Sequence, residues 1–205
     1  MDIKTIPDDF IVKVWANMAL CPQHIFLILT KRPRRMLEFV MEIGIPNHGI
    51  LPNVWLGCTV VNQQEADEKI PILRQIPAAV RFISVEPLLE QTDLCLSPGI
   101  EISAPYGIHG IHWVIAGGET GPGARPMHPA WARSVRDQCQ AAGVPFFFKQ
   151  WGEWAPHNEG SKYRQHCWNS GSSIRDLVVS SHVGKKAAGR LLDGREYNEL
   201  PEVKG

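Results

Sequence analysis

Five short apolar runs along the chain are each followed by charged or polar residues. The runs cover residues 24–30, 53–60, 80–85, 112–116 and 145–149. Continuous apolar runs of this length are typical of strands that are buried on both faces of a parallel sheet. Between them, apolar residues at helical spacing predict helices after Pro7, from Pro33 onward, over 62–75 and over 129–142.

The spacing of the runs indicates the fold class. Strand starts recur every 27 to 33 residues, which is the length of a β–α unit. We therefore predict an α/β protein with about five parallel strands and flanking helices. Five units are too few for an eight-stranded barrel, so the fold is expected to be a partial (β/α) barrel or an open parallel sheet.

The C-terminal quarter of the chain differs in composition. Residues 152–182 are rich in Gly, Ser, His and Asn and poor in branched apolar residues, which predicts an irregular appendage. Asp193-Gly194 predicts a hairpin turn close to the C-terminus. The expected division is a barrel domain over 1–151 and an appendage over 152–205.

Composition narrows the class of protein. Lys+Arg and Asp+Glu both number 21, so the formal net charge is zero, which argues against wholesale polyanion binding. No apolar run is long enough to span a bilayer and no signal peptide is visible, so a cytoplasmic protein is expected. The five cysteines include no Cys-x-x-Cys pair, which predicts free thiols and no local metal site.

Parallel strands place their carboxyl ends at the same edge of a sheet, and this edge is where α/β proteins bind ligands. The chain carries charged residues and glycines at these ends. A small-molecule ligand is therefore expected to contact Lys31, Arg32, Glu86, Gly117, Gly118, Glu119 and Lys149.

Each of these groups also has a purely structural interpretation. Lys31 and Arg32 before a helix start suit an anion site, or they reach solvent. Glu86 suits a ligand for an amine or hydroxyl, or a general base, or an ion pair with Lys31, Lys149 or Arg125 that ties strands together. Because Arg81 begins its strand, it is expected at the opposite rim with a structural role.

The segment from Gly117 to Gly123 is the strongest local signal. Two glycines at a strand end allow close approach of a ligand to the backbone, although a plain turn explains them too. The segment is neither a dinucleotide-binding fingerprint nor a phosphate loop. Further along, Trp151 and Trp154 beside Lys149 suit stacking on a nucleobase, or a hydrophobic lid over the end of the barrel.

Five stretches of the chain resemble a phage and prophage protein family of unknown function, named after bacteriophage gene products thirty-seven and sixty-eight. They read LTKRPRRM (29–36), NVWLGCTV (53–60), ADEKIPILRQIPAAVRFISVEPLL (66–89), WVIAGGETGPGARPMHPAWARSVRDQCQAAGVPFFFKQWGEW (113–154) and VGKKAAGRLLDGRE (183–196). The resemblance implies a radical S-adenosylmethionine-like barrel. For full-length members it also implies S-adenosylmethionine and a [4Fe–4S] cluster held by N-terminal cysteines.

The chain departs from this family at the cluster. None of its cysteines matches the cluster motif, so it resembles the C-terminal part of the family, and no cofactor is expected on this chain alone. Glycine–glycine–glutamate motifs in radical enzymes contact the amino group of S-adenosylmethionine. Gly117, Gly118 and Glu119 match that motif, although they follow a late strand.

Two other functions are consistent with the sequence, which names neither a substrate nor a reaction. A nucleic-acid-interacting module would use Lys31, Arg32, Arg34 and Arg35 with the tryptophan pair at 151 and 154. An assembly partner, as a second copy or another polypeptide, would complete the sheet along the exposed edge of the first strand. A gene remnant is the remaining interpretation.

Overall fold

The computed structural model describes residues 6–42, 50–96, 110–156, 163–169 and 177–202. Its main sheet has five parallel strands in the order β1-β2-β3-β4-β5, as predicted. The strands are β1 (Phe26–Thr30), β2 (Val54–Thr59), β3 (Val80–Val85), β4 (Trp113–Gly117) and β5 (Phe146–Gln150).

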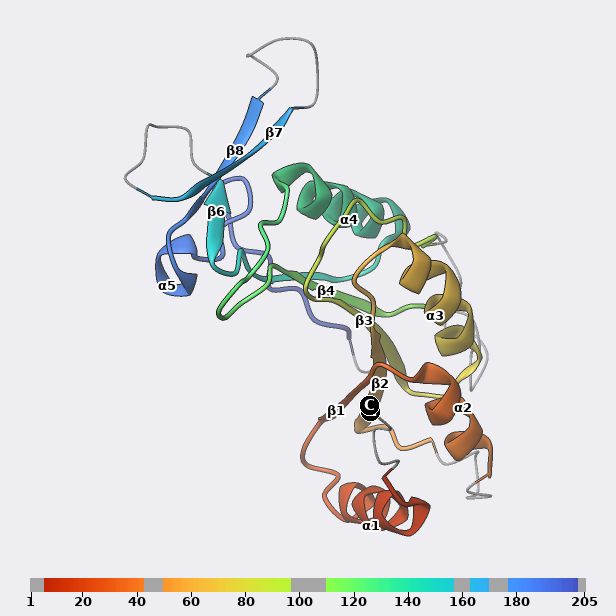
Figure 1. Cartoon of the computed structure of the whole chain (residues 1–205). Coiled ribbons are helices and arrows are strands. Elements are labelled where there is room, and N and C mark those ends of the chain that lie inside the picture. The colour runs from red at the N-terminus through yellow and green to blue at the C-terminus, as the bar shows by residue number, and fades with distance from the viewer. Residues whose placement is uncertain (1–5, 43–49, 97–109, 157–162, 170–176, 203–205) are drawn as a thin grey trace.

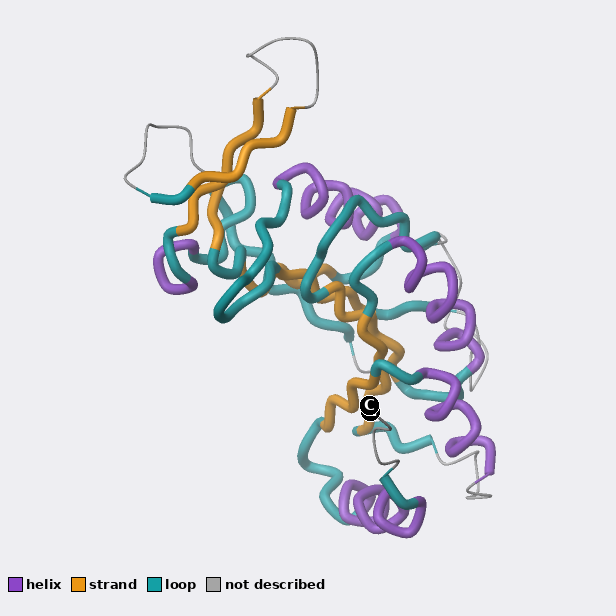
Figure 2. The backbone as a smooth tube through the Cα atoms, viewed as in Figure 1, coloured by secondary structure: helices purple, strands orange, loops and turns teal. Residues whose placement is uncertain are grey.

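Three helices connect the strands and lie along one face of the sheet (Figures 1 and 2). They are α2 (Pro33–Glu42), α3 (Gln63–Gln75) and α4 (Pro129–Ala142). The strand order never reverses and the connecting helices share one side, as in a (β/α) barrel, whereas a doubly wound sheet has helices on both faces. The structure confirms a five-stranded parallel sheet with flanking helices, and its winding is the one found in (β/α) barrels.

Local sequence signals determine where these helices begin and end. The Asn62 side chain accepts a hydrogen bond from the Glu65 backbone N–H at 2.8 Å, and the Glu65 carboxylate in turn accepts one from the Val61 backbone N–H, an arrangement close to a capping box. The helix α4 begins after His128, whose Nδ1 accepts a bond from the Ala130 N–H, and ends at Gly143 with a φ of 67°. The first helix, α1 (Asp8–Ala19), packs Trp15 and Met18 into the core.

The sheet separates two apolar layers. The layer between sheet and helices contains alternate residues of every strand, among them Leu56, Ile83 and Phe148. The opposite face carries a smaller cluster of mainly aromatic side chains: Trp55, Val80, Phe82 and Trp113, with Ile115 and Phe147 against them. This second face corresponds to the interior of a closed barrel.

The edge strand β1 is covered on one face. Its partner is β2, and Phe26 and Ile28 pack on the helix side, while Leu27 and Leu29 remain 49% exposed on the other side. Among the described strands β1 pairs with β2 alone, so its other edge is unpaired, as the sequence predicts. A partner chain along it stays a prediction.

The prediction of an irregular segment over 152–182 is wrong for the residues that the structure describes there. They form a three-stranded antiparallel sheet in the order β6-β8-β7, which projects from one end of the molecule (Figure 1). Its strands are β6 (Trp154–Pro156), β7 (Gln165–Asn169) and β8 (Leu177–His182), followed by α5 (Lys185–Ala188). Apolar periodicity is weak here because polar residues form much of each strand and tryptophan and histidine rings supply the packing.

The C-terminal segment returns to the main sheet. The predicted turn at Asp193-Gly194 is confirmed, with φ values of 52° and 80° and a bridge between Leu192 and Arg195. Beyond it, Tyr197 accepts a hydrogen bond from Phe148 at the free edge of β5, so the chain caps that edge. The division at residue 151 stays a prediction.

Two further expectations concern other parts of the chain. Most of the predicted excursion over 88–111 lies outside the described residues. Across the described part of the chain, no helix has the length and apolar character needed to cross a membrane.

Candidate ligand-binding rim

The central polar group at the carboxyl edge is an ion pair that spans three strands. Glu86 directly follows β3, and its Oε2 lies 3.0 Å from Nζ of Lys149 on β5. The two strands are separated by β4, whose last residue, Gly117, lies under the carboxylate: a Cβ at Gly117 would be 3.4 Å from Cδ of Glu86. Gly117 therefore leaves room for Glu86 to reach Lys149 across the intervening strand.

This ion pair remains accessible to solvent. The Lys149 side chain is 54% exposed and that of Glu86 is 20% exposed. A pair this open contributes between zero and about 1 kcal/mol to stability, so a ligand could replace it at low cost. Gln150 adds an amide near the same carboxylate, with Nε2 at 3.5 Å from Oε1 of Glu86.

Strand alternation places the pair on the barrel-interior face. Lys149 is two residues beyond Phe147, and Glu86 is two beyond Ser84, so each shares the face of its predecessor. Phe147 lies beside Ile115 of β4 in the sheet, and both are partly exposed. The rim thus combines one anion and one cation with adjacent apolar surface.

Gly118 has a different role from Gly117. A Cβ at Gly118 would lie 1.9 Å from the backbone oxygen of Trp151, and one at Gly152 would lie 2.1 Å from that of Glu119. Two backbones cross here at a distance that only glycine allows. The close approach that the sequence suggested for a ligand at Gly118 is taken by the protein's own chain.

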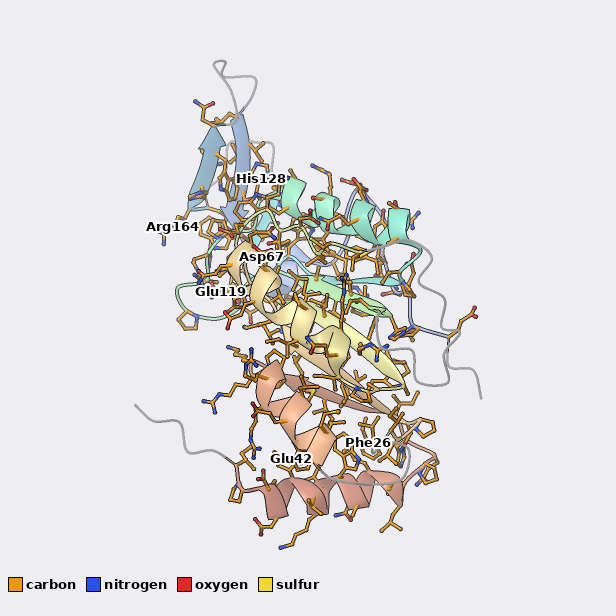
Figure 3. All side chains as sticks on the ribbon, turned by 90° about the vertical axis from the view of Figure 1, so that its right-hand side faces the viewer. Phe26, Glu42, Asp67, Glu119, His128 and Arg164 are labelled. Carbon is orange, nitrogen blue, oxygen red and sulfur yellow. The ribbon has the colours of Figure 1, made fainter. Side chains whose placement is uncertain are left out.

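Glu119 is held by the turn that follows it. Its carboxylate accepts hydrogen bonds from the backbone N–H, Nε and Nη2 of Arg125 at 2.8, 2.8 and 2.7 Å. The hydrogen bonds from the Arg125 side chain lower the pKa of Glu119, and those from its backbone add to the effect. Figure 3 labels Glu119 in this loop. Its carboxylate is therefore engaged within the protein.

Lys31 and Arg32 lie at the carboxyl end of β1, apart from the Glu86–Lys149 pair. They follow β1 at one edge of the sheet, and two strand spacings, about 10 Å, separate β1 from β3. Both side chains are exposed, and the Arg32 backbone N–H donates to Oγ1 of Thr30. Of the predicted contacts, the structure groups Glu86, Gly117 and Lys149, with Gly118 and Glu119 beside them.

The tryptophans proposed for base stacking are buried. Trp151 and Trp154 are each 4% exposed, and their Nε1 atoms donate to backbone oxygens of Leu191 and Ala124 at 2.9 and 2.7 Å. Arg35, another member of that proposed surface, forms an ion pair with Asp8 of α1. The described residues therefore do not assemble the nucleic-acid surface that the sequence suggested around Lys31.

Two residues with a clear role at the rim were not selected from the sequence. Gln150 lies next to Lys149, and strand position alone could have suggested it. Glu153 accepts hydrogen bonds from the backbone N–H groups of Gly121 and Lys185, and these bonds lower its pKa. It connects the turn after β4 to α5, and no local motif in the sequence indicates this contact.

The cysteines do not fit an iron–sulfur cluster. Cys58 and Cys139 are fully buried in the apolar core, and burial raises the pKa of each thiol to about 12, whereas a cluster requires thiolates. All five cysteines are free. Within the described ranges, no group of three or more His, Cys, Asp or Glu side chains could hold a metal ion.

The fold and the rim define a singly wound β/α protein with a polar carboxyl edge and a small antiparallel sheet at one end. A family model described as "Protein of unknown function (DUF5131)" matches residues 2–201, and the chain belongs to that family. No curated protein and no solved structure matches it.

Proposed function

We propose that this chain forms one wall of a ligand site in a radical S-adenosylmethionine-like barrel and binds the amino-acid end of S-adenosylmethionine or a related zwitterion. The single observation that carries the proposal is the solvent-accessible Glu86–Lys149 pair at the carboxyl edge. It lies where α/β barrels bind their ligands.

The chemistry of the pair matches that ligand class. An α-amino acid carries an ammonium group and a carboxylate on the same carbon. Glu86 is suited to accept hydrogen bonds from the ammonium group, and Lys149 to donate to the carboxylate. Phe147 and Ile115 offer adjacent apolar surface to the remainder of the ligand.

The structure favours Glu86 over Glu119 as the partner of the ammonium group. Glu119 already accepts three hydrogen bonds from Arg125, and a ligand that bound to Glu119 would have to replace all three. A ligand that bound to Glu86 would replace one hydrogen bond from an exposed lysine and one long hydrogen bond from Gln150. Binding at Glu86 is therefore the less costly arrangement.

The proposal is limited to binding. S-adenosylmethionine supplies a sulfonium centre for radical or alkyl-transfer chemistry. The residues of this chain would bind and orient its amino-acid end. Because the cysteines do not fit a [4Fe–4S] cluster, no cleavage step is assigned to this chain.

Isothermal titration calorimetry with S-adenosylmethionine tests this function. We expect saturable binding, weakened at least about ten-fold by Glu86→Gln or Lys149→Met, because each removes one charge contact. Lys31→Met is the matched control, since Lys31 is an exposed lysine at a distant strand end, and it should bind like the wild type. Absence of saturable binding at millimolar ligand, or equal affinities in all variants, contradicts the proposal.

Phage or prophage origin belongs to the same proposal and is supported by the resemblance of residues 113–154 to that family. The genes that surround the coding sequence in its genome test this part of the proposal. We expect the coding sequence to lie among phage genes. A location among unrelated chromosomal genes argues against this part of the proposal.

A further inference from the structure

The small sheet carries a row of rings and a cation on one face, separate from the Glu86–Lys149 pair. Alternation along β7 places His166 and Trp168 on the same face. Arg164, just before the strand, shares that face, because its guanidinium lies 5.8 Å from the ring of Trp154. Gln165 and Cys167 lie on the opposite face.

The row continues from the small sheet onto the main body. The rings of His166 and Trp168 are 4.4 Å apart, and Trp168 lies 4.9 Å from His128 at the start of α4. Trp131, one turn into α4, lies 6.2 Å from Trp168. We call Arg164, His166, Trp168, His128 and Trp131 the aromatic row. Figure 3 labels His128 and Arg164 at the end of the molecule that carries the small sheet.

The aromatic row is accessible to solvent, unlike the other tryptophan clusters. Arg164 and His166 are exposed, and Trp168, His128 and Trp131 are partly exposed. By contrast, Trp55 and Trp113 on the main sheet are each 4% exposed. A ring must be accessible to stack on a ligand, and by its exposure the row is the better stacking surface of the two.

The charge of this region differs from that of the whole chain. Of the residues that the structure describes between 152 and 192, four are Lys or Arg and one is acidic, whereas the complete chain has a net charge of zero. The acidic residue, Glu153, is engaged with backbone N–H groups. The aromatic row therefore lies in a locally basic part of a neutral protein.

We propose that the aromatic row binds single-stranded nucleic acid. Unpaired bases stack on exposed aromatic rings, and cations beside them attract the phosphates, which is the usual combination in single-strand binding surfaces. His166, Trp168 and Trp131 supply the rings, and Arg164 supplies the cation. A duplex buries the faces of its bases and would gain only the electrostatic contribution.

Fluorescence anisotropy with labelled 12-mer oligonucleotides tests the proposal on the complete chain. We expect single-stranded DNA or RNA to bind more tightly than the duplex of the same sequence. Comparison of single-stranded DNA with single-stranded RNA shows which backbone the protein prefers. Binding should weaken about ten-fold between 50 and 200 mM salt. Absence of binding at 50 mM salt, or equal affinity for duplex and single strands, would overturn the proposal.

Variants on the two faces of β7 locate the surface. Trp168→Ala and Arg164→Gln should each weaken single-strand binding at least about five-fold, because one removes a stacking ring and the other a charge. Gln165→Ala is the matched control on the opposite face and should bind normally. Circular dichroism shows whether Trp168→Ala unfolds the small sheet. If it does, Arg164→Gln decides the test, because Arg164 is exposed and its replacement should leave the sheet folded. Equal loss in the control and in Arg164→Gln would contradict the assignment.

The two proposed sites can be separated experimentally. Glu86→Gln should leave oligonucleotide binding unchanged, and Arg164→Gln should leave binding of S-adenosylmethionine unchanged. Failure of either proposal therefore leaves the other standing.

Discussion

The two adjacent glycines at the end of β4 differ in how much room each has for a side chain. A Cβ at Gly117 would contact neighbours at 3.4 Å, an ordinary van der Waals distance, whereas a Cβ at Gly118 would lie 1.9 Å from a backbone oxygen. Gly118→Ala should therefore destabilise the fold by about 3 kcal/mol or more, and Gly117→Ala by about 1 kcal/mol or less. Urea denaturation of both variants measures the difference. Equal destabilisation would show that the backbone crossing at Gly118 and Gly152 is wrongly placed.

A partly buried histidine at the amino end of β4 makes stability depend on pH. Burial lowers the pKa of His112 from 6.5 to about 4, and the charge of Arg81 adds to the effect. The unfolded chain therefore binds a proton between pH 6.5 and 4 that the folded chain does not, so stability falls as pH falls through this range. Between pH 7 and 5 the loss should be about 1–2 kcal/mol.

The variant His112→Asn isolates this contribution. Nδ1 of His112 accepts a hydrogen bond from the Arg81 backbone N–H at 2.9 Å, and the Asn side-chain oxygen can accept the same bond without titrating. Thermal unfolding at pH 7 and pH 5 should show a smaller loss in the variant than in the wild type. Glu119, Glu153 and Asp193 have lowered pKa values, so their contributions disappear at more acidic pH. An identical loss in variant and wild type would rule out His112 as the cause.

At the scale of elements, β1 should tolerate polar residues on one face only. Leu27 is 49% exposed on the barrel-interior face, whereas Leu56 on β2 is 1% exposed beneath the helices. We expect Leu27→Lys to change the free energy of unfolding by about 0.5 kcal/mol or less and Leu56→Ala to cost about 2–5 kcal/mol. Chemical denaturation provides both values. A large cost for Leu27→Lys would mean that this face is covered in solution, and a change in solution mass would then identify a second copy.

The strands and helices of the main sheet could be predicted from sequence because their signals are local. Apolar runs defined all five strands, and Asn62 and Gly143 marked helix ends. The small sheet could not be predicted in this way. Its strands carry polar residues such as Gln165 and Ser180, and they depend on contacts between distant rings, such as that of Trp168 with His128.

The candidate rim was predicted only in part, since its geometry depends on strand order. The sequence indicated that Glu86 and Lys149 follow strands, and a pairing between them was one of the alternatives. Lys31 and Arg32 were expected at the same edge, and their separation from Glu86 follows from the place of β1 at the end of the strand order. The role of Gly118 depends on Trp151, a residue far along the chain.

At the scale of the whole molecule, a five-stranded parallel sheet and a small antiparallel sheet carry two chemically distinct surfaces. One is the carboxyl edge with Glu86 and Lys149, and the other is the aromatic row at the small sheet. The apolar interior face is filled by its own aromatic residues near Trp113, whose Nε1 donates to the backbone oxygen of Glu199. Ligand access on this face is therefore expected at the carboxyl edge.

The central claim is that Lys149 recognises the carboxylate of a zwitterionic ligand while Glu86 recognises its ammonium group. Calorimetric titration with S-adenosylmethionine and with its decarboxylated analogue tests this most directly, because the two ligands differ in the carboxylate alone. Wild-type protein should bind the complete ligand at least about ten-fold more tightly, and Lys149→Met should bind both equally. Equal binding of the two ligands by the wild type, or unchanged discrimination in Lys149→Met, would contradict the claim.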